Sequence, residues 1–143
     1  SVFPPLICQL GIKLNGIVVI SGASNFQTLR FGDKNDLPYI CFLPTYAASA
    51  RYHKQLDDEL LAMPVSKVVE RAERFSTGEY ASVFLQGSQA SERSINLVVK
   101  EMHRLTGLNE TFIRQSYLRP TVSAFGKEVL REDGKTIGRF DSR

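Results

Sequence analysis

The strongest apolar pattern in the chain is the unbroken β-branched run Ile17–Ile20, which lies between Asn15-Gly16 and Ser21-Gly22. A run that is apolar at every position predicts a strand covered on both faces, as in a parallel sheet sandwiched between helices. One strand cannot form a sheet by itself, and most of the later pattern is helical. We therefore expect the chain to be part of something larger.

Helical periodicity dominates after residue 36. Asp36 is placed to cap a helix that has Pro38 in its first turn, and Pro44 is expected to break that helix or begin a second one. The small residues Ala47-Ala48-Ser49-Ala50 permit the close approach of another backbone or a ligand. Apolar residues at helical spacing predict further helices over 64–75, 79–86, 91–106, 109–115 and 121–131.

Polar residues and glycines suggest where several of these helices begin and end. Ser76-Thr77-Gly78-Glu79 has the form of a capping box, which predicts a new helix start. Asn109 is placed to cap a short helix, and Gly87 and Gly107 are placed to end the helices before them. A short helix is also expected over 3–10, and Asp133-Gly134 indicates a turn.

Composition narrows the class of protein. A chain of 143 residues with 43% hydrophobic and 23% charged residues is long enough for a globular domain with a core. Its 18 basic residues are interleaved with 15 acidic ones, which argues against a nucleic-acid partner. The sequence has neither an apolar run of about 18 residues nor a signal-peptide pattern, so no membrane span is predicted.

Motifs for known chemistry are mostly missing. The sequence has no nucleophile elbow, phosphate-binding glycine loop or metal-ligand spacing, so we predict no metal and no cofactor. Ser24 is expected to cap a helix rather than act as a nucleophile.

Cys8 and Cys41 lack a paired spacing and are expected to be buried thiols. His103 is expected to be a surface or hydrogen-bonded residue, whereas His53 lies among aromatic neighbours and is a pocket candidate.

Aromatic residues are dense between positions 26 and 52. Most are expected in a core, but tyrosines interleaved with small residues also line ligand pockets. The candidates for a substrate pocket are Asn25, Phe26, Tyr39, Tyr46, Tyr52 and His53.

Six stretches of the chain carry a resemblance to a known family: 14–21, 24–31, 35–39, 43–48, 52–53 and 130–143. Taken together they resemble a serine carboxypeptidase, specifically a bacterial member of that peptidase family. The resemblance covers about residues 11 to 143 and is most specific in its first third.

The resemblance implies a fragment of an α/β-hydrolase that is mainly α as it stands. Residues 1–32 would be part of the hydrolase core and would contain a helix, one strand and an outgoing loop. Residues 33–143 would form the helical cap. The intact enzyme would release C-terminal residues from peptides through a Ser-Asp-His triad, and its location would be periplasmic or secreted. No residue of this chain matches the triad or the oxyanion-hole motif, so the chain alone is expected to be inactive.

Two other functions are compatible with the sequence. The first is a stand-alone helical module that binds a partner protein, or a second copy, through exposed apolar faces. The second is an unrelated esterase that depends on Ser24. The environment of Ile17–Ile20 would discriminate between the two hypotheses. Pairing with another strand would favour the hydrolase cap, and docking on the helices would favour the stand-alone module.

Overall fold

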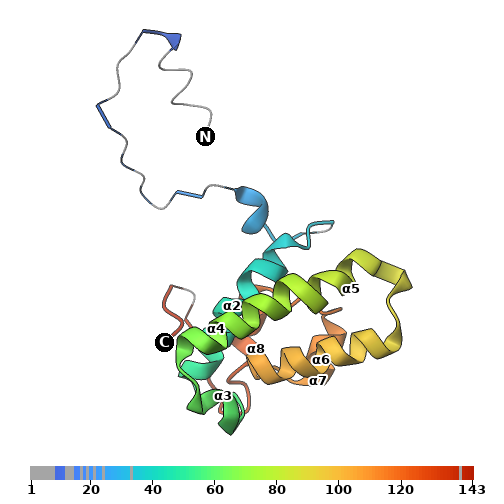
Figure 1. Cartoon of the computed structure of the whole chain (residues 1–143). Coiled ribbons are helices and arrows are strands. Elements are labelled where there is room, and N and C mark those ends of the chain that lie inside the picture. The colour runs from blue at the N-terminus through green and yellow to red at the C-terminus, as the bar shows by residue number, and fades with distance from the viewer. Residues whose placement is uncertain are drawn as a thin grey trace.

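The computed structural model of the protein describes residues 9–11, 15–16, 18, 20, 22–23, 25–32, 34–138 and 140–143. This part of the chain is mainly helical (Figure 1). It contains no strand, and its one isolated β-bridge joins Gly32 and Asn35. The elements in chain order are η1 (Phe26–Thr28), α2 (Leu37–Tyr52), α3 (Asp58–Ala62), α4 (Val65–Phe75), η2 (Ser76–Tyr80), α5 (Ala81–Gln86), η3 (Gly87–Gln89), α6 (Glu92–Thr106), α7 (Glu110–Gln115) and α8 (Val122–Glu128).

The predicted strand is described at two of its positions. Val18 and Ile20 lie outside any strand, and their side chains are 87% and 85% exposed. The prediction of a covered strand is therefore wrong for these two residues, because no strand in the described part of the chain offers their backbone a partner. Ile17 and Val19 lie outside the described residues, as does nearly all of the helix predicted over 3–10.

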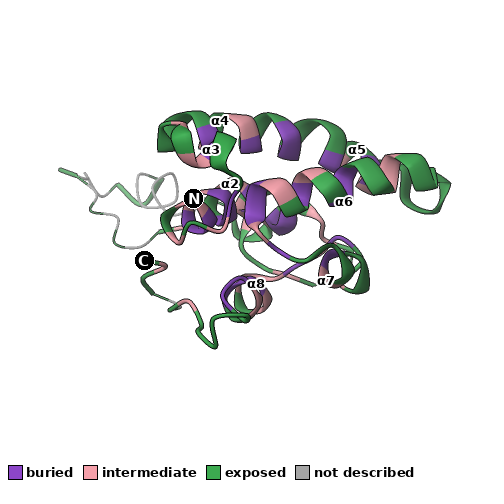
Figure 2. Cartoon of the chain, turned by 90° about the horizontal axis from the view of Figure 1, so that it is seen from below, coloured by how far each residue is buried: buried purple, intermediate pink, exposed green. Residues whose placement is uncertain are grey.

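Helix α2 lies at the centre of the helical body and packs against α4, α6 and η2 (Figure 2). Ala47 and Ala50 are fully buried and Ser49 nearly so, which confirms that the small residues of α2 allow other elements to approach closely. The core around them also takes side chains from α3, α7 and α8, including Leu60, Ile113 and Phe125.

The beginning of α2 differs in part from the prediction. Pro38 lies in the first turn as expected, but the Asp36 side chain makes no capping hydrogen bond. Its Oδ1 instead accepts a hydrogen bond from Nε of Arg119 at 2.6 Å. Pro44 does not break the helix, since α2 continues to Tyr52. Buried Leu43 and Ala47 flank the proline, and their packing offsets a cost of roughly 3 kcal/mol.

The predicted capping box at 76–79 does not start a helix. The hydroxyls of Ser76 and Thr77 donate to the carbonyl of Glu73 at 3.1 and 2.7 Å, so they bond back to α4. The chain continues through the π-turn η2, with a kink at Gly78 (φ −97°, ψ −105°). The prediction was wrong because hydroxyls that can cap a helix also bond to the preceding turn when the chain stays helical.

The remaining predicted boundaries hold closely. Ser91, Asn109 and Thr121 cap α6, α7 and α8, each by accepting a hydrogen bond from a backbone N–H of the first turn. Gly107 ends α6 in the left-handed conformation (φ +68°), and Gly87 follows α5 with φ +52°. Helix α8 ends at Glu128, earlier than the predicted Arg131.

Helix α3 was not predicted from the sequence. Asp57 caps it, because its Oδ1 accepts a hydrogen bond from the Leu60 N–H at 2.9 Å. Hydrogen bonds from Arg104 and from the Leu60 N–H hold the pKa of Asp57 below its usual value. After the helix, Arg51 of α2 donates through Nε to the carbonyl of Met63 at 2.9 Å. Helix α3 is thus held at both ends by arginines from other helices.

Candidate functional site

An aromatic groove of about 720 Å³ lies between α2, α8 and the C-terminal segment 136–142. This volume is within the range of small-molecule and cofactor sites. Residues from four separate parts of the chain line the groove: Leu29, Phe31, Phe42, Thr45, Tyr46, Ser49, Thr121, Val122, Ser123, Phe125, Gly126, Lys127, Thr136, Ile137, Gly138, Phe140 and Ser142.

Four aromatic rings form a continuous row in the groove. Tyr46 stacks on Phe125, with ring centroids 4.3 Å apart and planes 13° apart. Phe42 follows Tyr46 at 6.3 Å, and Phe31 follows Phe42 at 5.3 Å. Tyr46 and Phe125 are each 3% exposed, so the apolar surface on which an aliphatic or aromatic group can pack comes mainly from the partly buried Phe31 and Phe42.

One charge and several hydroxyls accompany the aromatic row. Among the described residues that line the groove, Lys127 is the only charged one. Lys127 lies exposed in the last turn of α8 and makes no ion pair within the described part of the chain. No carboxylate of the described residues lines the groove beside it, so the local charge favours an anionic ligand group.

Tyr46 also fixes the geometry of the groove through its hydroxyl. The hydroxyl donates to the carbonyl of Pro120 at 3.2 Å, which joins α2 to the segment leading into α8. Burial raises the pKa of Tyr46 well above its usual value, and neighbouring Tyr39 raises it further. The phenol therefore stays neutral and remains a donor at ordinary pH.

Replacing Tyr46 with phenylalanine is expected to lower the free energy of unfolding by about 1 kcal/mol at neutral pH, because the Pro120 carbonyl loses its donor. The ring and its stacking on Phe125 are retained. Since the pKa of Tyr46 is raised on folding, its contribution is complete below the unfolded value of about 10 and is lost as the pH rises through the folded value. The wild type should therefore lose stability above about pH 10 more steeply than Tyr46→Phe.

Urea unfolding followed at pH 7 and at several values above pH 10 would measure both effects. Tyr52→Phe is the control, because Tyr52 is 59% exposed and should behave like the wild type. Equal alkaline losses in Tyr46→Phe and the wild type would contradict the expected role of the Tyr46 phenol.

The predicted pocket residues are spread over a larger region than one site. Tyr46 lines the groove, whereas Tyr39 is buried beside it, with its ring 5.1 Å from Phe31. Tyr52 is exposed at the end of α2. His53 reaches the groove indirectly, since its Nε2 lies 2.7 Å from the carbonyl oxygen of Ser142. A carbonyl only accepts, so Nε2 carries the proton in this contact.

Asn25 and Phe26 lie apart from the groove lining. The Asn25 Oδ1 caps η1 by accepting from the Gln27 N–H at 2.9 Å. Phe26 is 62% exposed, and the guanidinium of Arg30 lies 5.6 Å from its ring centroid. Both residues remain pocket candidates only by prediction. Ser24, predicted to cap this turn, lies outside the described residues.

Several residues of the groove were not predicted as site residues. Phe125 was assigned to the apolar face of a helix, and Lys127 had no pattern to single it out. Thr136 and Ile137 lie in the late stretch that carries the family resemblance, which was the one available signal for them. Only the folded chain brings these residues to Tyr46.

The described residues contain no assembled catalytic pair. The ring nitrogens of His53 and His103 contact the carbonyl oxygens of Ser142 and Leu108, both at 2.7 Å. Neither histidine forms an ion pair with a carboxylate in the described part of the chain. The prediction that His103 is a hydrogen-bonded surface residue is confirmed.

Other features of the described residues limit the chemistry further. No group of three or more His, Cys, Asp or Glu side chains lies together within the described ranges in a way that could hold a metal ion. Cys41 is exposed, so the prediction of a buried thiol is wrong there, and Cys8 lies outside the described residues. Helices long and apolar enough to span a membrane are not found in the described part of the chain.

The groove is thus defined by its chemistry: an aromatic surface, hydroxyl groups and one ammonium group. Such a surface can bind a ligand that combines an apolar group with a negative charge. Comparisons of the chain with models of protein families, with curated proteins and with solved structures gave no match.

Proposed function

We propose that this chain forms the helical cap of a serine carboxypeptidase-like hydrolase and supplies one wall of its substrate pocket. One observation carries the proposal. Three of the stretches that resemble the family, 24–31, 43–48 and 130–143, contribute residues to the same groove. The fold brings these stretches, which are far apart in sequence, together at one surface.

The chemistry of the groove is compatible with a peptide that ends in a free carboxylate. The aromatic row can receive an apolar C-terminal side chain, and the ammonium of Lys127 can attract the carboxylate. In this proposal the Ser-Asp-His triad comes from outside this chain. A nucleophile and its base must lie within hydrogen-bond reach, and the described residues contain no such pair.

The test begins by sequencing the complete reading frame that encodes the chain. The chain and the complete product are then assayed for release of the C-terminal residue from N-blocked dipeptides. We expect no turnover by the chain alone and turnover by the complete product. A reading frame that adds no sequence, or a complete product without peptidase activity, would sink the proposal.

Lys127→Met in the complete product then tests the groove itself. Loss of the ammonium should raise KM for dipeptide acids about tenfold while kcat changes little, because one charged contact is worth about 1.4 kcal/mol. Lys67→Met is the matched control, since Lys67 lies on α4, pairs with Glu70 at 2.8 Å and is not among the groove lining. An unchanged KM in Lys127→Met would show that the groove does not hold the carboxylate.

A stand-alone interaction module remains the second candidate, and one observation favours it. The side chains of Leu85, Leu97 and Tyr117 are 90%, 62% and 78% exposed. Val18 and Ile20 neither pair with a strand nor dock on the helices, so they do not discriminate between the two candidates. Light scattering over a concentration series would detect self-association, and Leu85→Glu and Leu97→Glu would locate its surface.

A further inference from the structure

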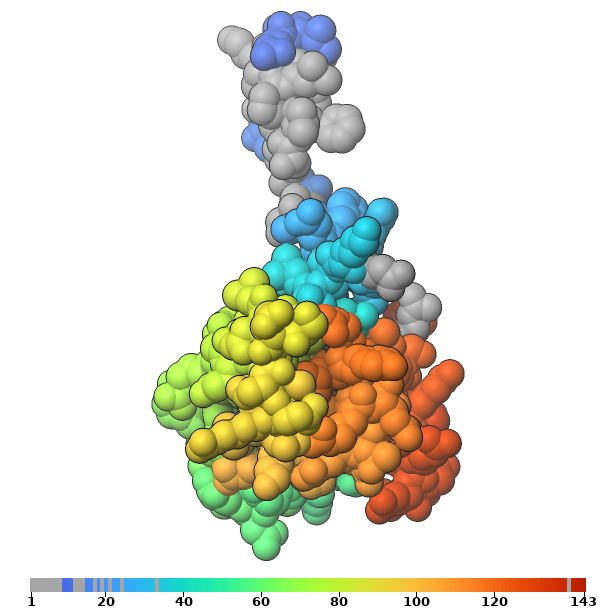
Figure 3. Space-filling model, turned by 90° about the vertical axis from the view of Figure 1, so that its right-hand side faces the viewer, coloured from blue at the N-terminus to red at the C-terminus, as the bar shows by residue number. Residues whose placement is uncertain are grey.

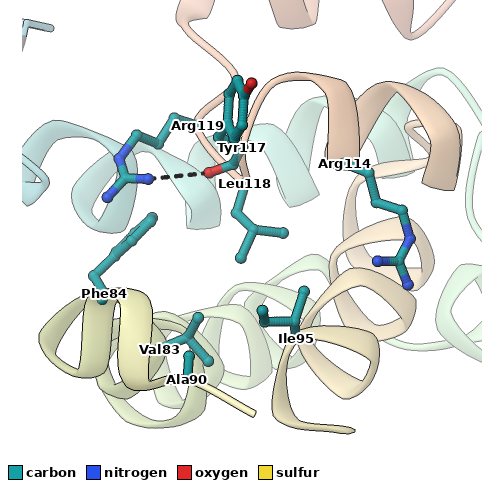
Figure 4. Close-up of a pocket in the computed structure, with 9 residues that line it drawn as sticks. Val83, Phe84, Ala90, Ile95, Arg114, Tyr117, Leu118 and Arg119 are labelled. Atoms are coloured by element: carbon teal, nitrogen blue, oxygen red, sulfur yellow. Dashed lines mark hydrogen bonds between the residues drawn. The ribbon is translucent and has the colours of Figure 1, made fainter. Parts of the chain in front are cut away.

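A second cavity, which we call the arginine pocket, has a volume of about 260 Å³. It lies where the junction of α5 and α6 meets the segment that follows α7. Figure 3 shows the α5–α6 junction, in yellow, beside the orange segments that come later in the chain. Figure 4 shows the residues that line it. They are Val83, Phe84, Gly87, Ala90, Ile95, Arg114, Tyr117, Leu118 and Arg119.

The interior of the arginine pocket is apolar. Val83 and Leu118 are each 7% exposed, and Phe84, Ala90 and Ile95 are partly buried beside them. Water binds poorly in an apolar cavity, because it finds no polar partners for its hydrogen bonds. Such a cavity can instead accept an apolar molecule. A sugar or another polyhydroxylated ligand would find few partners for its hydroxyls on this surface.

The two arginines at the rim lie to either side of Leu118 (Figure 4). Arg119 donates through Nε to Asp36 Oδ1 at 2.6 Å, and its guanidinium lies 4.3 Å from the Phe84 ring centroid. Asp36 therefore neutralises this charge and fixes the side chain. Phe84, held under the guanidinium, then forms a rigid wall of the pocket.

Arg114 differs from Arg119 because its partner is neutral. Its Nη2 donates to Oδ1 of Asn96, and it makes no ion pair with a carboxylate in the described ranges. A guanidinium has five N–H donors, so most of its hydrogen-bonding capacity remains for another group. The rim of an apolar pocket thus carries one uncompensated positive charge.

The backbone at the pocket is held in an uncommon conformation. Tyr117 and Leu118 are consecutive residues with φ of +52° and +63°, which costs roughly 1–2 kcal/mol for each. The Tyr80 hydroxyl donates to the carbonyl of Leu118 at 2.6 Å, and the Leu118 N–H donates to the carbonyl of Ile113 at 2.9 Å. These bonds hold the Leu118 side chain in the pocket, so the cavity is formed before any ligand enters.

We propose that the arginine pocket binds a small carboxylate that carries a compact apolar group. The apolar group packs on Phe84, Ile95 and Leu118, and the carboxylate accepts hydrogen bonds from Arg114 at the rim. An amine is disfavoured by the same positive charge. The proposal concerns a site separate from the aromatic groove and does not depend on the proposed hydrolase function.

Titration of the isotope-labelled chain with 3-phenylpropionate, followed by amide NMR, tests the proposal. We expect saturable shifts centred on Ile95 and Leu118. The neutral 3-phenylpropionamide should bind about tenfold more weakly, because it lacks the charge-assisted hydrogen bonds. No saturable shift, equal binding of the amide, or shifts centred on Tyr46 and Phe125 in the aromatic groove would overturn it.

Variants separate the charge from the cavity. Arg114→Gln should weaken binding of the carboxylate about tenfold and remove its advantage over the amide. Arg93→Gln is the matched control, since Arg93 is an exposed arginine of α6 outside the pocket and its replacement should leave binding unchanged.

Ala90→Leu should fill the cavity and block the binding of both ligands. If Ala90→Leu does not fold, Ile95→Phe serves the same purpose. Equal affinity in Arg114→Gln and the wild type would refute the site.

Discussion

Replacing Gly107 with alanine is expected to lower the free energy of unfolding by about 3 kcal/mol. Two effects add at this position. Gly107 has φ of +68°, a conformation that costs an L-residue with a side chain roughly 1–2 kcal/mol. A Cβ atom there would lie only 2.7 Å from the carbonyl oxygen of Gln55 and 2.8 Å from its Cβ. Relief of this contact requires the end of α6 to move away from the segment that follows α2.

Gly134→Ala separates the two effects. Gly134 also has positive φ, at +66°, close to that of Gly107, but no atom lies within 4 Å of a Cβ atom placed there. Its replacement should therefore cost only about 1 kcal/mol, from the backbone conformation alone. Urea unfolding of both variants would give the difference at constant m-value. An equal decrease in the free energy of unfolding in both variants would mean that the end of α6 does not lie as close to Gln55 as described.

Replacing Leu60 with alanine is expected to cost about 3 kcal/mol, within the range for large-to-small changes in cores. Leu60 is fully buried, although it lies on the five-residue helix α3. So short a helix has no stability of its own in water. Its position depends on Leu60, on the cap from Asp57 and on Arg104, whose Nε donates to Asp57 Oδ2 at 2.7 Å.

Leu85→Ala is the matched control, because Leu85 is 90% exposed and its loss should change stability by no more than about 0.5 kcal/mol. Denaturant unfolding gives the stability of both variants, and amide hydrogen exchange at Leu60 and Leu61 reports whether α3 opens locally. Similar stabilities of Leu60→Ala and Leu85→Ala would show that α3 is not anchored in the core.

The features of the fold that the sequence alone determined are those with a local cause. The starts of α6, α7 and α8 were predictable because Ser91, Asn109 and Thr121 each bond to a backbone N–H only two or three residues ahead. The end of α6 at Gly107 was predictable for the same reason, since a left-handed residue closes a helix locally. The mainly helical class follows from these signals and from the spacing of apolar residues.

Predictions were wrong where a local signal competes with packing. Pro44 is a helix breaker in isolation, yet α2 continues through it because buried residues flank it on both sides. Ser76 and Thr77 have capping side chains, but those hydroxyls bond back to the carbonyl of Glu73. Helix α3 was missed because five residues carry too little periodicity to be recognised.

Neither cavity could have been located from the sequence. The aromatic groove depends on the stacking of Tyr46 on Phe125, and the arginine pocket depends on the contact of Arg119 with Asp36. Local sequence placed Tyr46 on a helix and Arg119 in the segment between two helices. Only the tertiary structure decided their partners, because a contact between residues so far apart requires the helices between them to pack first.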